Sequence, residues 1–176
     1  MTGKHKIRRY PLAVSGGHAV GLLLFSAALA AIDQAIKRIV SAYPDGAVLI
    51  DISPVFDVVH TMNTGAAFSL FSGNAVLLLV VTTLMLLVIA AFVLFAPKLS
   101  AAARFLLAAL LGGGIGNWID RLQTGLVTDY IRLQFVRFPV FNFADICISL
   151  SVVGMMFLLL FDRLEYHSGE THGSVH

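Results

Sequence analysis

The sequence predicts an α-helical membrane protein with four transmembrane helices. Of its 176 residues, 58% are hydrophobic and 12% are charged, whereas a soluble domain has about 45–50% apolar and about 25% charged residues. The mean hydropathy is +0.87. A chain this short cannot hide so much apolar surface from water, because small domains leave a large share of their surface exposed. The composition therefore excludes a soluble globular enzyme, a disulfide-linked secreted domain and a disordered chain.

The four spans are expected at residues 17–40, 75–96, 105–120 and 140–162. Each approaches the length of about 20 mostly apolar residues that a helix needs to cross a bilayer, and the second carries no charge. The first span follows a basic stretch and so also fits a cleavable secretion signal. The polar residues just beyond it favour a permanent span, because cleavage would strand them.

Lysine and arginine residues outside the spans predict that both termini are cytoplasmic. This orientation leaves seven of them inside and five outside, when Lys37 and Arg38 at the outer end of the first span are counted as outside. The excess inside agrees with the positive charge of cytoplasmic loops. Residues 1–16, 97–104 and 163–176 are then cytoplasmic, while 41–74 and 121–139 face outward. Within the first outer segment, two short β-branched stretches at 47–52 and 56–60 predict strands of a small sheet.

The polar residues of the spans gather at one membrane surface. A charged side chain at mid-bilayer costs roughly 2.5–3.5 kcal/mol, so the few that occur need a partner or a function. Any one of them could simply cap a helix or reach toward the interface. That all of these polar residues lie at the same membrane surface instead indicates a site. The residues are Asp33, Gln34, Lys37, Asn117, Asp120, Arg121, Asn142 and Asp145, with Asp129 in the adjoining loop.

Two of these acids, Asp129 and Asp145, are candidates for chemistry. Asp129 lies in the otherwise apolar stretch 127–131, and Asp145 lies inside the last span. Two carboxyl groups held close together in a poorly solvated site tend to share one proton. The ionised member can accept a proton from water, and the protonated member can donate to a carbonyl oxygen or a leaving amine. Which acid carries the proton first stays open.

Five sequence motifs, in order along most of the chain, resemble those of the lipoprotein signal peptidases, the type II signal peptidases of bacterial inner membranes. Each motif is a weak pattern alone, but the ordered set is specific. The chain departs from the family at Tyr130, where phenylalanine is usual, and in the short 132–139 connection, which affects the outer helix and the lid. The motifs are Asp33-Gln34-x-x-Lys37, Asn63-Thr64-Gly65-Ala66-Ala67-Phe68, Gly113-x-x-Gly116-Asn117-x-x-Asp120-Arg121, Val127-x-Asp129-Tyr130-Ile131 and Phe141-Asn142-x-Ala144-Asp145.

The resemblance implies an aspartyl endopeptidase that removes the signal peptide from diacylglyceryl-modified prolipoproteins. Water would hydrolyse the bond before the lipidated cysteine. The family's fold adds a small periplasmic β-cradle and a short outer helix, which we expect within residues 41–74. Carried over by motif, the catalytic residues are Asp129 and Asp145, the substrate-binding residues are Asn63, Arg121, Asn142 and Asn117, and the supporting residues are Asp33, Lys37, Gly65 and Asp120.

The resemblance also implies the protein's surroundings and partners. We expect a monomer in the bacterial inner membrane with its active site near the periplasmic face. Its partners are then the lipid-modified prolipoprotein and membrane lipid. We expect no metal, no cofactor and no nucleic acid.

Other mechanisms lack their sequence signatures. Neither the Gly-x-Gly-Asp motif of a second class of intramembrane aspartyl proteases nor the His-Glu-x-x-His motif of metalloproteases occurs. Cys147, the single cysteine, has no base at a matching spacing and is typical of a packed hydrophobe. A proton-coupled carrier is the alternative from another class, but its polar groups should run through the bilayer depth. The middle of the second and fourth spans is almost wholly apolar.

Overall fold

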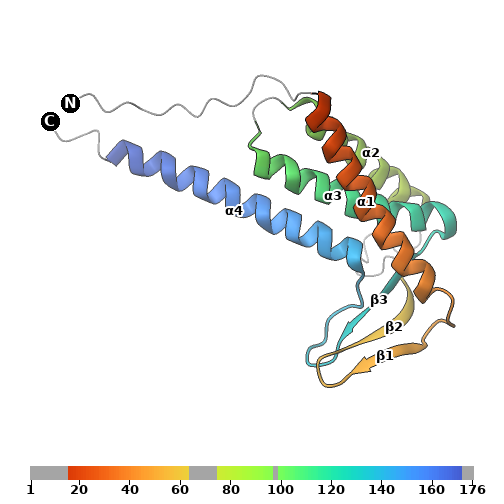
Figure 1. Ribbon diagram of the computed structural model, residues 1–176. Coiled ribbons are helices and arrows are strands. Elements are labelled where there is room, and N and C mark those ends of the chain that lie inside the picture. Colours follow the sequence, from red (N-terminus) through yellow and green to blue (C-terminus); the bar gives the residue numbers. More distant parts are fainter. Residues whose placement is uncertain (1–15, 64–74, 97–98, 172–176) are drawn as a thin grey trace.

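The computed structural model describes residues 16–63, 75–96 and 99–171, with side chains described as far as residue 161. Within these ranges the chain forms four long helices and one three-stranded sheet (Figure 1). All four helices are long and apolar enough to cross a membrane, which confirms the predicted fold class. The helices are α1 (Gly16–Val40), α2 (Ala75–Phe95), α3 (Ala101–Thr124) and α4 (Phe143–Thr171).

Helix α3 is longer than the expected span at both ends. It begins at Ala101 rather than residue 105, because the Ser100 side chain caps it by accepting a hydrogen bond from the Ala103 N–H (3.1 Å). Alanine is the strongest helix former, so the three alanines after the cap continue the helix readily. The helix ends at Thr124 and is capped by Gly125, whose φ of 75° is left-handed and favours glycine.

Helix α4 is shifted toward the C-terminus relative to the expected span. It begins at Phe143 instead of residue 140, because Asn142 occupies its N-cap position. It continues to Thr171, well into the stretch 163–176 that the sequence predicts as a cytoplasmic segment beyond the last span. That stretch has no proline and no glycine before Gly169, so nothing in it stops the helix at the membrane boundary.

Helix α3 lies at the centre of the bundle and contacts the other three helices. Its glycines permit this close packing, as small residues do between membrane helices. A Cβ at Gly112 would lie 2.7 Å from the Ser26 carbonyl oxygen of α1, and one at Gly113 would lie 2.6 Å from the Ala144 carbonyl oxygen of α4. Ser26 Oγ also donates a hydrogen bond to the Ala108 carbonyl of α3 at 2.7 Å.

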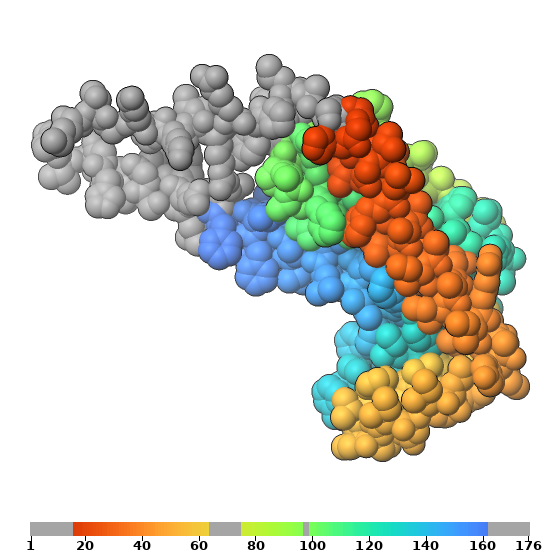
Figure 2. Space-filling model, viewed as in Figure 1, coloured from red at the N-terminus to blue at the C-terminus, as the bar shows by residue number. Residues whose placement is uncertain are grey.

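An antiparallel sheet projects from one end of the helical body (Figures 1 and 2). Its strands are β1 (Val48–Ile52), β2 (Phe56–Asn63) and β3 (Val127–Leu133), in the order β1-β2-β3. Strands β1 and β2 lie where the sequence predicts strands, whereas β3 lies in the segment 121–139, for which the sequence predicts only a connection. Its partner β2 is more than sixty residues away in the chain, and such a pairing leaves no local signal in the sequence.

The expected short outer helix has no counterpart among the described residues of the two outer segments. Residues 64–74 lie outside the described part of the chain, and with them Gly65 and its motif from Thr64 onward.

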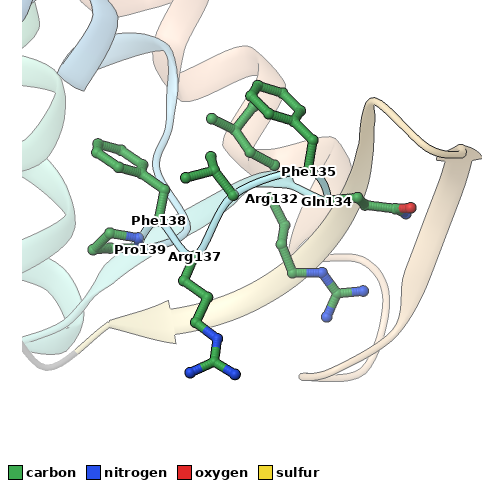
Figure 3. Close-up of a pocket in the computed structure, with 8 residues that line it drawn as sticks. Arg132, Gln134, Phe135, Arg137, Phe138 and Pro139 are labelled. Atoms are coloured by element: carbon green, nitrogen blue, oxygen red, sulfur yellow. The ribbon is translucent and has the colours of Figure 1, made fainter.

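The connection from β3 to α4 borders an open hollow of about 810 Å³ (Figure 3). Phe135 and Phe138 beside it are 70% and 56% exposed. None of the predicted site residues lines this hollow.

Candidate active site

The predicted polar residues meet where the helices join the sheet. The end of α1 carries Asp33 and Lys37, four residues apart and therefore on one helical face. The described part of the chain brings eight further polar residues to the same place, and we call the whole set the polar cluster. Its other members are Gln34 on α1, Asn63 on β2, Asn117, Asp120 and Arg121 on α3, Asp129 on β3, and Asn142 and Asp145 at the start of α4.

The start of α4 holds Asp145 in place through a reciprocal cap. Asn142 Oδ1 accepts a hydrogen bond from the Asp145 N–H (3.0 Å), and Asp145 Oδ2 accepts one from the Asn142 N–H (3.1 Å). This is the arrangement of a capping box. The N–H groups of the two residues between them donate to Tyr130 Oη (3.1 Å) and Asp33 Oδ1 (3.0 Å). The first-turn donors of a buried helix end are thus satisfied within the cluster, which fixes the position of the Asp145 carboxylate.

Asn142 connects the two candidate catalytic acids. Its side-chain Nδ2 donates to Asp129 Oδ1 at 2.7 Å, while its backbone N–H donates to Asp145 Oδ2. Each acid has one further amide donor: Asn63 Nδ2 lies 2.7 Å from Asp129 Oδ2, and Asn117 Nδ2 lies 2.8 Å from Asp145 Oδ1. Both carboxylates are therefore oriented by two hydrogen bonds each, and they share one residue as a partner.

Lys37 is the cation beneath this arrangement. Its side chain is only 3% exposed, and Nζ lies 2.8 Å from Asp33 Oδ2, 2.9 Å from Asp120 Oδ2 and 2.8 Å from Asn117 Oδ1. An ammonium group has three donors and no acceptor, so it must face the oxygen of Asn117. The amide nitrogen of Asn117 is thereby turned toward Asp145.

Gly116 makes room for this ion pair. A Cβ at Gly116 would lie 2.5 Å from Asp33 Oδ2, closer than real Cβ contacts. Asp33 cannot turn away easily, because it is fully buried and bonded to Lys37 and to the backbone of α4. The glycine in the third motif is therefore explained by close approach of α1 to α3.

Asp120 links the end of α3 to the sheet. Its Oδ2 accepts a hydrogen bond from the Thr128 N–H at 3.0 Å, and its Oδ1 accepts one from Gln34 Nε2 at 2.7 Å. The sequence places Gln34 among the polar residues that indicate a site but gives it no specific role, and nothing in the sequence distinguishes Thr128. The contribution of Thr128 depends on the packing of β3 beside α3, which the sequence alone does not show.

Arg121 is half-buried beside the carboxylates. Its Nη1 donates to the Asn117 carbonyl oxygen at 3.3 Å, and it lies within electrostatic reach of Asp145, Asp120 and Asp129. The guanidinium has five donors, so it retains capacity to bind a carbonyl or carboxylate oxygen. Unlike Lys37, which is buried between Asp33 and Asp120, Arg121 forms no ion pair within 4.0 Å among the described residues.

The electrostatics of Asp129 favour proton transfer. The side chain is 2% exposed, and this burial raises the pKa of its carboxyl to about 6. The hydrogen bond from Asn63 lowers the pKa, the neighbouring charge of Asp145 raises it, and the hydrogen bond from Asn142 lowers it again. A carboxyl group that titrates near neutral pH beside a second carboxyl group is suited to general acid–base chemistry.

The donor set does not suggest a metal centre. Among the residues whose positions are described, no group of three or more histidine, cysteine, aspartate or glutamate side chains could hold a metal ion. Between Asp33 and Asp120, the place of a cation is taken by the Lys37 ammonium group. Cys147 is a half-buried free thiol on α4.

Comparison with known proteins identifies the family. The sequence profile described as signal peptidase (SPase) II matches residues 25–161. A lipoprotein signal peptidase of Dehalococcoides mccartyi strain BAV1 is 37% identical over 161 residues, which cover 88% of this chain and 98% of that protein. A lipoprotein signal peptidase of Thermosynechococcus vestitus is 37% identical over 105 residues, which cover 60% of this chain and 66% of that protein.

The fold agrees with solved structures. A bacterial membrane enzyme determined by the in meso method at 2.3 Å resolution matches with a TM-score of 0.75 and 25% sequence identity, over 88% of this chain and 94% of that one. A second, at 1.9 Å resolution, matches with a TM-score of 0.72 and 25% identity. Fold and comparisons together define a multi-pass membrane peptidase. The chain belongs to the signal peptidase II family, the lipoprotein signal peptidases, whose role is to cleave signal peptides from prolipoproteins.

Proposed function

We propose that the peptidase is of the aspartic type and that Asp129 and Asp145 activate the water molecule that attacks the scissile bond. The observation that carries this proposal is the Asn142 bridge, because one residue donates hydrogen bonds to both carboxyl groups. The raised pKa of Asp129, about 6, supports it further. A pair in which one acid is protonated and the other ionised is the form that such hydrolysis requires.

The reaction then proceeds without a covalent intermediate. The ionised carboxylate removes a proton from water as the water oxygen attacks the carbonyl carbon, and the protonated carboxyl group donates its proton to the carbonyl oxygen. Breakdown of the tetrahedral intermediate breaks the C–N bond, and a proton passes to the leaving amine. One water molecule is consumed and the pair regains its single proton. The proton belongs to the pair and not to a named acid, since the two groups titrate together.

Arg121 and Asn63 are the residues that we propose hold the substrate. Arg121 is half-buried with donors to spare, and Asn63 lies against Asp129 at the end of β2. The substrate is the diacylglyceryl-modified prolipoprotein, cut just before its lipidated cysteine. Its signal-peptide helix lies among the membrane spans while its lipid chains face the bilayer.

We further propose that the protein works as a monomer in the inner membrane, with both termini cytoplasmic and the polar cluster near the periplasmic face. The lysine and arginine distribution supports this orientation. The contacts of the cluster support the monomer, because Lys37, Asn117 and Asn142 find the partners described above within one chain.

The proposal is tested with purified protein and a lipid-modified precursor. Asp129→Asn and Asp145→Asn should each lower kcat about 10²–10⁴-fold, the usual contribution of a general acid or base. Asp51→Asn is the matched control, because this aspartate lies exposed on β1, outside the polar cluster. Cleavage at the wild-type rate by either dyad variant would refute the assignment, and a thermal melt of each variant checks that the fold is retained.

A further inference from the structure

A groove along α1 and α3 lies beside the polar cluster and is not used by the proposed mechanism. It encloses about 530 Å³, within the range of about 300–1,000 Å³ typical of small-molecule sites. The two helices pack against each other, and Figure 1 shows that they cross at an angle. The walls of the groove include the small side chains Ala27, Ala30 and Ala31 of α1 and the larger Leu111 and Ile115 of α3. We call it the lateral groove.

The lateral groove has an apolar end and a polar end. From Leu23 to Ala31 the α1 side is apolar except for Ser26, and this stretch rises about 12 Å along the helix axis. The polar end carries Gln34 and Arg38, and Arg38 lies about 22 Å from Leu23 along the axis. Half of a hydrocarbon core of about 30 Å is about 15 Å. The groove thus spans about one leaflet, with Arg38 at the level of the lipid headgroups.

Arg38 is the feature that selects an occupant. It is exposed and makes no ion pair with any residue in the described part of the chain. Its neighbour Lys37, by contrast, is buried between two aspartates. Gln123 of α3, also exposed, lines the same end of the groove and adds an amide donor. An arginine with a nearby amide is a suitable partner for a phosphate oxygen, because the guanidinium donates in a fork that matches phosphate geometry.

We propose that the lateral groove binds an anionic phospholipid, with one acyl chain along the alanines and the phosphate at Arg38. Basic pockets between membrane helices bind acidic headgroups by this combination of charge and apolar contact. A second membrane helix would fill the apolar part but would leave Arg38 without an anion. A zwitterionic lipid carries a cationic group beside its phosphate, and this group competes with Arg38 for the phosphate oxygens.

A headgroup bound in the groove adjoins the polar cluster at Gln34. Gln34 lines the groove and also donates from Nε2 to Asp120 Oδ1 (2.7 Å) and to the Gly116 carbonyl oxygen (3.0 Å). The lipid therefore adjoins a residue that orients part of the cluster, although it touches neither Asp129 nor Asp145.

Native mass spectrometry of the full chain, titrated with dioleoyl-phosphatidylglycerol or dioleoyl-phosphatidylcholine, tests the proposal. Wild-type protein should retain phosphatidylglycerol in preference to phosphatidylcholine. Arg38→Gln should lower the apparent affinity for phosphatidylglycerol about fivefold, the factor that corresponds to about 1 kcal/mol per arginine near an anionic surface. Arg137→Gln is the control, because Arg137 is also exposed but lies on the β3–α4 connection, outside the groove.

Two further outcomes decide the occupant. Ala31→Phe, which fills the groove from an exposed position, should abolish the binding of phosphatidylglycerol, while the spectrum still shows a single chain. If Ala31→Phe instead abolishes a dimer, the groove accommodates a second copy and the proposal fails. Equal retention of both lipids by wild-type protein, or unchanged affinity in Arg38→Gln, also overturns it. Prolipoprotein cleavage by these variants serves only to confirm that they are folded.

Discussion

Removing the amide donor of Asn63 should shift the alkaline limit of activity to higher pH. Asn63 Nδ2 donates to Asp129 Oδ2 at 2.7 Å, and this bond lowers the pKa of Asp129 against the raising effect of burial. In Asn63→Leu the ionised carboxylate loses that donor, so its pKa rises above about 6. Because the pair is active with one proton, activity is lost at alkaline pH when that proton leaves.

The size of the shift follows from the strength of the bond. A hydrogen bond to a charged group contributes about 1.5–3 kcal/mol, and one pKa unit corresponds to about 1.36 kcal/mol. The alkaline limb of kcat/KM should therefore move upward by about 1–2 pH units in Asn63→Leu. The maximum rate should also fall, since Asn63 is proposed to hold substrate, but the position of the limb is the diagnostic quantity.

The assay is the pH profile of precursor cleavage by purified wild-type and variant protein. Gln134→Leu provides the control. Gln134 Nε2 donates a hydrogen bond to the exposed Asp51 (3.1 Å), so this substitution removes an amide donor from a carboxylate outside the polar cluster. Its alkaline limb should coincide with that of the wild type. A limb that stays in place or moves to lower pH in Asn63→Leu would refute the idea that the charge on Asp129 controls the upper limit.

Two further predictions concern stability. Gly116→Ala should lower the free energy of unfolding by about 1–3 kcal/mol, as overpacking does, because the new Cβ meets the fixed carboxylate of Asp33. Gly114→Ala is the control, because its Cβ meets only the mobile end of a leucine side chain. In a thermal melt, Gly114→Ala should lower the melting temperature less than Gly116→Ala does. Arg132 holds the pKa of Asp57 below its usual value, so this ion pair stabilises the fold above the unfolded pKa of about 3.9 and is lost as the pH falls through the lower folded value. Arg132→Gln should therefore lower the melting temperature at pH 7, and the difference from wild type should shrink below about pH 4; an equal difference at both pH values would contradict this account.

The membrane class and the count of spans could be predicted from the sequence because hydropathy is a local property. Apolar runs of sufficient length must lie in lipid whatever their neighbours are. The position of the polar residues at the span ends could be predicted for the same reason, since the spans set the level of each residue. The order of the five motifs also indicates the family, because it is a property of the sequence alone.

The boundaries and the third strand required more than local pattern. Ser100 and Asn142 set helix starts through side-chain caps that hydropathy does not detect. Strand β3 forms because it can pair with β2. A single strand has unpaired backbone groups, so its stability depends on a partner elsewhere in the chain.

Hydropathy along the chain is enough to establish four spans and to set the rare polar groups at one level. It does not establish which of these groups bind one another, because that depends on how the helices pack. Lys37 faces the oxygen of Asn117 from eighty residues away, and this choice turns the amide toward Asp145. Hydrogen-bond partners depend on distances of a few ångströms between separate helices, and those distances are set by packing at glycines such as Gly116 and not by the polarity of any one segment.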